Sequence, residues 1–127
     1  MPKEINLLVS FDLPDAHKKQ LSEVSESINL TVLPVRQAAE IPAERWAEAE
    51  ILYTWNVLPE PEQAPNLKWV QFNSAGVDTF LDHPLLQKEG VIATSMSGVI
   101  TGQMAEYVLM AMLAFGQKLP KLNRLKA

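Results

Sequence analysis

The residues best suited to bind a ligand lie in a short polar stretch, Asn73-Ser74-Ala75-Gly76, that follows a predicted buried strand. A turn of this composition can point successive backbone N–H groups into one concavity, and such a concavity holds an anion. Gly76 tolerates positive φ and allows a ligand or a second backbone to approach closely. An ordinary strand-to-helix turn has the same composition, so this stretch alone leaves both interpretations open.

Trp55 and Asn56 form a second candidate, because they end another predicted strand on the same edge as the Ser74 turn. Ligands of open α/β sheets bind outside the carboxyl ends of the strands. Trp55 and Asn56 are therefore predicted to line a ligand pocket. Tyr53, which lies earlier in the same strand, is expected to pack in the core.

The remaining polar residues predict neither a metal site nor a catalytic triad. Asp78, Asp82 and His83 are close in sequence but lack a further ligand, so surface and capping roles are expected. His17 falls on the solvated face of a predicted helix, and neither histidine is placed for a Ser-His-Asp arrangement. Glu106 is favoured near a helix N-terminus by the helix dipole.

Composition narrows the class of protein. The chain has 127 residues, 47% of them hydrophobic and 20% charged, which indicates a folded domain with a substantial core. The net charge is −4 and no basic cluster is present, so a nucleic acid partner is not expected. The five glycines form neither a Gly-x-Gly-x-x-Gly motif nor a P-loop, and no cysteine is available for disulfides or zinc thiolates.

The expected location is the cytoplasm, without membrane attachment. The N-terminus has an early acidic residue and no small-residue cleavage site, so it does not resemble a signal peptide. The most apolar run, residues 104–115, is about half as long as a membrane-spanning helix needs to be.

Predicted strands and helices alternate along the chain. This alternation indicates an α/β fold in which an open parallel five-stranded sheet carries helices on both faces, as in flavodoxin-like proteins. Strands are predicted at residues 5–11, 30–35, 51–55, 68–72 and 90–94, and helices at 16–27, 42–49, 79–87 and 101 to about 117.

The last predicted helix has no polar face. From residue 104 to residue 115 only Glu106 is charged, and a helix that is apolar all round must be buried all round. A five-stranded domain of this size covers one side of such a helix, so we expect it to dock against another body of protein. Thr101 is the predicted N-cap of this helix.

Five motifs together resemble the N-terminal part of the D-isomer-specific 2-hydroxyacid dehydrogenases. Each motif is loose, but their order and spacing are specific. The resemblance covers residues 65–118 by motif and residues 5–60 by layout only. The motifs are Pro65-Asn66-Leu67-Lys68-Trp69-Val70, Ser74-Ala75-Gly76-Val77-Asp78, Gly90-Val91-Ile92-Ala93-Thr94, Gly98-Val99-Ile100-Thr101 and Ala105-Glu106-Tyr107-Val108-Leu109.

The resemblance implies a flavodoxin-like substrate domain at residues 1–100, and an interdomain connecting helix with a tail at residues 101–127. It implies hydride transfer between C2 of a 2-hydroxy or 2-keto acid and the nicotinamide of NAD or NADP. Three roles follow from it. The N–H groups of Ser74, Ala75 and Gly76 hold the substrate carboxylate, Trp55 and Asn56 face the substrate side chain, and Thr101 and Met104 reach toward the nicotinamide end of the cofactor.

The family's catalytic arginine, glutamate and histidine and its glycine-rich NAD loop follow the connecting helix, and none of them falls within these 127 residues. We therefore expect an N-terminal substrate-binding part that lacks its Rossmann domain, is inactive alone, binds no NAD tightly and self-associates through residues 104–115. The alternative is a stand-alone module of flavodoxin-like fold that binds a small carboxylate or dimerises. A flavin protein or a receiver with Asp12 as its acid is a weaker alternative.

Overall fold

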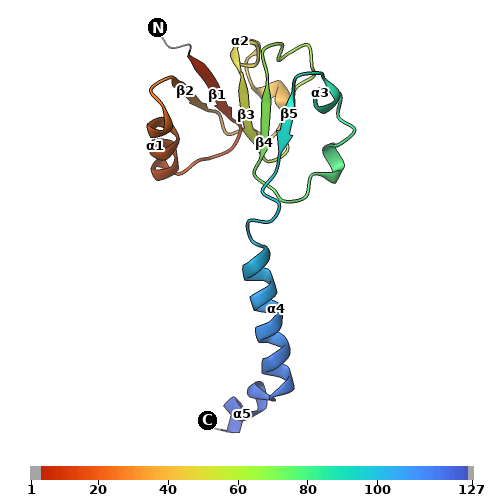
Figure 1. Ribbon diagram of the computed structural model, residues 1–127. Helices are drawn as coiled ribbons and strands as arrows, with labels where there is room; N and C mark the ends of the chain where they lie inside the picture. The colour runs from red at the N-terminus through yellow and green to blue at the C-terminus, as the bar shows by residue number, and fades with distance from the viewer. Residues whose placement is uncertain (1–3, 126–127) are drawn as a thin grey trace. The chain divides into compact units, whose positions relative to one another are not determined.

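The computed structural model describes residues 4–125. Its first part is a five-stranded sheet in the order β2-β1-β3-β4-β5, and every neighbouring pair is parallel (Figure 1). This order is the flavodoxin-like one. The predicted α/β class and parallel sheet are confirmed. The strands are β1 (Ile5–Val9), β2 (Ile28–Val32), β3 (Ile51–Thr54), β4 (Trp69–Phe72) and β5 (Ile92–Thr94).

One face of the sheet carries the larger core. Alternate side chains of the central strands, such as Leu52 and Val70, are fully buried on this face. Helices α2 (Ala43–Glu48) and α3 (Pro84–Gln87) cover it with Trp46 and Leu85.

The opposite face is only partly covered. Helix α1 (Asp15–Val24) contributes Leu21 to a smaller cluster built on Leu7, Val9 and Leu13. Toward β4 and β5 the same face stays open, and 39% of Trp69 and 64% of Ile92 are exposed. Helices therefore lie on both faces, as predicted, but unequally.

Two predicted helices differ from the structure in extent. The helix predicted at residues 16–27 is α1, which ends at Val24, and the strand predicted at residues 30–35 begins two residues earlier, at Ile28, which pairs with Ile5. The helix ends earlier because Ser25 is extended, with φ of −162°. The helix predicted at residues 79–87 is instead a 3-10 turn at Asp78–Phe80 followed by α3, because a proline at residue 84 forces His83 into an extended conformation.

The chain packs as two compact units, Met1–Met96 and Ser97–Ala127. The second unit contains α4 (Thr101–Gly116) and α5 (Leu119–Leu125), and no residue of either helix is buried. The predicted domains, 1–100 and 101–127, stay a prediction, and residues 1–3 and 126–127 of them lie outside the described residues.

The start of α4 differs from the prediction by one residue. Ile100 is the N-cap, Thr101 is the first helical residue, and no side chain caps the helix. Gly98, with φ of +89°, turns the chain just before this start. Among residues 4–125 no helix is long and apolar enough to cross a membrane.

Candidate functional site

The turn after β4 begins as a continuation of the sheet. The Asn73 N–H donates to the carbonyl of Thr54 at 2.7 Å, which extends the pairing of β4 with β3 by one bond. Farther on, the Met96 N–H donates to the Ser74 carbonyl at 2.9 Å, and the Ser74 hydroxyl donates to the Gly76 carbonyl at 3.1 Å. The turn is therefore attached to the strand on each side of β4.

Three successive N–H groups of this turn have no partner in the part of the chain that the structure describes. Within residues 4–125, none of the N–H groups of Ser74, Ala75 and Gly76 donates a hydrogen bond to another residue. Ala75 and Gly76 are exposed, and Ser74 is half-buried. Successive N–H groups that are free and open to solvent can hold an anion such as a carboxylate.

Gly76 is not required by the fold of this turn. Its φ lies outside the left-handed region, which among the described glycines only Gly90 and Gly98 adopt. A Cβ atom built on Gly76 would meet only the Asp78 carboxylate, at 4.0 Å. The glycine therefore leaves space above the turn that the protein itself does not fill.

Aromatic side chains surround the neighbouring strand ends. Trp55 and Asn56 follow β3 directly and are exposed, and their pocket-lining role stays a prediction. Phe11, which follows β1, contacts the ring of Tyr53 edge-to-face at 4.9 Å and that of Trp55 at 6.1 Å. The sequence prediction placed Phe11 inside a strand and missed this contact. Phe11 is the last residue of its predicted strand, as Trp55 is of its own, and this common position was the available signal.

Tyr53 does more than pack in the core. Its side chain is only partly buried, and its hydroxyl donates to Oδ1 of Asn73 at 2.7 Å. Burial raises the pKa of Tyr53 above its ordinary value. This link between β3 and the start of the turn was not predicted.

A buried hydroxyl pair lies beneath these residues. The Ser10 hydroxyl donates to Oγ1 of Thr54 at 2.6 Å, and Oγ1 of Thr54 accepts from the Val57 N–H at 2.9 Å. Both side chains are at most 2% exposed. The bond between them joins the ends of β1 and β3 and restrains this end of the sheet. Both hydroxyls are buried, so a ligand cannot reach them.

Thr101 and Met104, the predicted cofactor contacts, belong to the second unit and are exposed on α4. That role stays a prediction. Two exposed side chains without a phosphate-binding loop do not make a site for NAD. The described residues therefore do not fit NAD by themselves.

The described part of the chain also lacks a metal site, since no three His, Cys, Asp or Glu residues within it gather to hold an ion. His83 has the capping role that was expected for it. Its Nδ1 accepts from the Leu85 N–H at 3.2 Å at the start of α3.

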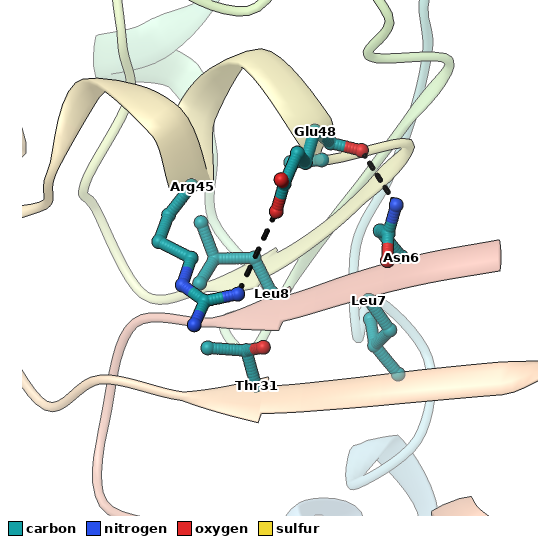
Figure 2. Close-up of a pocket in the computed structure, with 7 residues that line it drawn as sticks. Asn6, Leu7, Leu8, Thr31, Arg45 and Glu48 are labelled. Carbon is teal, nitrogen blue, oxygen red and sulfur yellow. Dashed lines mark hydrogen bonds and ion pairs between the residues drawn. The ribbon is translucent and has the colours of Figure 1, made fainter.

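A small pocket between α2 and the β1–β2 edge is not a ligand site (Figure 2). Arg45 Nη1 lies 3.5 Å from Glu48 Oε2 across it, and Asn6 donates to the Glu48 carbonyl at 3.1 Å. Its volume of about 10 Å³ is close to that of a single water molecule.

Solved dehydrogenase structures superpose on most of the chain. D-lactate dehydrogenase from Aquifex aeolicus, solved with NAD and lactic acid, is 20% identical with a TM-score of 0.63, and the match covers 93% of this chain and 38% of that one. Phosphoglycerate dehydrogenase from Lactobacillus plantarum is 28% identical with a TM-score of 0.57, covering 87% and 34%. Glyoxylate reductase from Paecilomyes thermophila is 16% identical with a TM-score of 0.62, covering 90% and 38%.

The chain resembles the D-2-hydroxyacid dehydrogenases. The resemblance inferred from the five motifs is thereby confirmed, and the chain spans little more than a third of the length of each matched structure. No protein-family model and no curated protein sequence matches it.

Proposed function

We propose that the first unit is the substrate domain of an NAD(P)-dependent D-2-hydroxyacid dehydrogenase. The turn at Ser74, Ala75 and Gly76 binds the carboxylate of a 2-hydroxy or 2-keto acid. The observation that carries this proposal is the set of three unpaired N–H groups at the carboxyl end of β4. The superposition on dehydrogenases of this class supports it.

The chemistry of the turn suits a carboxylate. Three neutral donors bind an anion without a buried counter-charge, and a hydrogen bond to a charged group contributes about 1.5–3 kcal/mol. Trp55 and Asn56, exposed at the end of β3, contact the side chain of the acid in this proposal. The aromatic surface of Trp55 and Phe11 favours an apolar side chain over a charged one.

The chain's share of the reaction is to bind and orient the acid. A partner Rossmann domain would bind the cofactor, which would supply the nicotinamide for hydride exchange with C2. We expect this assembly in the cytoplasm. Thr101 and Met104 face the nicotinamide end of NAD or NADP in that assembly. We therefore expect the chain alone not to oxidise NADH with glyoxylate or pyruvate. Turnover by the purified chain would contradict this division of labour.

Nuclear magnetic resonance titration tests carboxylate binding directly. Adding glyoxylate or pyruvate to the labelled chain is expected to shift the N–H signals of Ser74, Ala75 and Gly76 in a saturable manner. Sodium chloride at matched ionic strength is the control. Shifts that are equal with chloride, or that gather on other residues, would overturn the proposal.

A second candidate is the stand-alone module that binds a small carboxylate or dimerises. The exposed apolar side chains of α4 favour dimerisation. The reading frame after residue 127 separates the two candidates. A downstream Gly-x-Gly-x-x-Gly motif supports the dehydrogenase, and a stop codon supports the module.

A further inference from the structure

We infer that Tyr53 is a positioning residue for the carboxylate-binding turn, because its hydroxyl holds the side chain of Asn73, the residue from which the turn departs. The inference deepens the proposed function and rests on it for the identity of the ligand. The positioning itself depends only on contacts within the first unit.

The register of the sheet explains how Tyr53 reaches Asn73. Tyr53 pairs with Gln71, and side chains of a strand alternate between the two faces. Asn73 lies two residues beyond Gln71 and therefore follows it on the face that carries Tyr53. A diagonal neighbour of this kind is within reach of a long aromatic side chain.

Asn73 is consequently fixed through both its side chain and its backbone. Its N–H donates to the carbonyl of Thr54 at 2.7 Å, and its Oδ1 accepts from the Tyr53 hydroxyl at 2.7 Å. Two bonds to adjacent residues of β3 restrict the rotation of Asn73. The first bond fixes the peptide that joins Phe72 to Asn73, and the second fixes the Asn73 side chain, so the residue from which the turn departs is anchored.

The ring of Tyr53 is itself supported. Phe11 contacts it edge-to-face, with the ring centroids 4.9 Å apart and the ring planes at 78°. Leu13 and Leu21 pack in the same cluster. Tyr53 therefore links the loop after β1, through Phe11, to the turn after β4, through Asn73.

The turn has three other attachments. They are the bond from the Asn73 N–H to the Thr54 carbonyl, the bond from the Met96 N–H to the Ser74 carbonyl and the bond from the Ser74 hydroxyl to the Gly76 carbonyl. Without the Tyr53 bond, the turn keeps these three but loses the side-chain restraint at its entry. Its N–H groups are then less well ordered for an anion, and an ordered set of donors is what makes binding strong.

A double-mutant cycle tests the inference. Tyr53→Phe removes the hydroxyl and keeps the ring, Asn73→Ala removes the acceptor, and the third protein carries both changes. Protection from amide hydrogen exchange is measured at residue 73, whose N–H donates to the Thr54 carbonyl, and at Met96, whose N–H donates to the Ser74 carbonyl. This protection is expected to fall about five- to ten-fold in each single variant, the size of one net hydrogen bond. The double variant is expected to match the single ones, since all three lack the same bond.

Dissociation constants for glyoxylate provide the functional readout, and each variant is expected to bind about five- to ten-fold more weakly, in proportion to that bond. Tyr107→Phe is the matched control because Tyr107 is the other tyrosine of the chain and is 67% exposed on α4. Exchange at Leu8 in β1 reports global unfolding, so comparing Leu8 with the turn separates local loosening of the turn from a loss of overall stability.

The outcomes are distinguishable. Unchanged exchange in Tyr53→Phe, or additive effects in the double variant, would overturn the inference. If the wild-type chain fails to bind glyoxylate while the exchange cycle behaves as expected, the proposed function fails and the positioning role of Tyr53 stands.

Discussion

A substitution at Gly76 is expected to change ligand binding without lowering the stability of the fold. Its φ permits other residues, and an added Cβ atom meets only the Asp78 carboxylate at 4.0 Å. Gly76→Ala is therefore expected to keep or slightly raise the free energy of unfolding, by up to about 1 kcal/mol. Glyoxylate binding is expected to weaken, since the methyl group occupies the space above the N–H groups. Urea unfolding measures the change in stability, and the nuclear magnetic resonance titration with glyoxylate measures the change in binding.

Gly90→Ala is the matched control for Gly76→Ala. Gly90 has φ of +85°, a conformation that costs alanine about 1–2 kcal/mol. This variant is expected to lose stability and to keep its affinity for glyoxylate. Unchanged binding in Gly76→Ala would remove the turn from the proposed site.

The ionisation of Tyr53 predicts a loss of stability in alkali. Burial raises the pKa of its phenol, so the folded protein keeps this proton while the unfolded chain has already lost it. More protons are then bound by the folded state, and the free energy of unfolding falls as the pH rises. The fall begins near the ordinary value of about 10 and ends above the raised pKa.

Urea unfolding across this alkaline range is the measurement. Tyr53→Phe is expected to flatten part of the decline, and Tyr107→Phe is the control. An equal decline in the wild type and Tyr53→Phe would contradict the prediction.

Among the elements, α2 is held mainly by one buried side chain. The helix has six residues and no side-chain cap at its N-terminus, so it has little stability of its own. Trp46 is 1% exposed, and its Nε1 donates to the Ala38 carbonyl at 3.0 Å. Trp46→Ala is expected to cost about 3–5 kcal/mol of unfolding free energy, measured by chemical denaturation. Trp55→Ala, at a site that is 49% exposed, is the control and is expected to change stability far less.

How well each element was predicted depends on whether its signal is local. The strand at β3 was predicted closely because Ile51-Leu52-Tyr53-Thr54 has a strong local preference for an extended, half-buried strand. The start of β2 at Ile28 was missed because an apolar residue four positions after Val24 fits a helix as well as a strand, and only its pairing with Ile5 decides between them. For the site, the turn at Ser74–Gly76 and Trp55 could be named as candidates from the sequence, because polar turns and residues at strand ends are local signals. The Tyr53–Asn73 bond could not, because it depends on a cross-strand register that one sequence does not specify.

For the molecule as a whole, the exposed surface of α4 predicts self-association. Most of its large apolar side chains are more than half exposed, including Met104 at 60%, Leu109 at 59% and Met112 at 67%. Contiguous apolar surface above a few hundred Å² usually marks an interaction site. We expect the chain to associate through residues 104–115, and exchange of helices between copies is one form this could take.

Sedimentation over a range of concentrations tests the association, and paired variants locate it. Leu109→Lys and Met112→Lys place a charge on α4 and are expected to shift the protein toward the monomer. Val24→Lys is the control, because Val24 is 72% exposed on α1, in the first unit. A wild-type chain that stays monomeric at high concentration would contradict the prediction. Association that Val24→Lys weakens and the α4 variants leave intact would place the interface on the first unit instead.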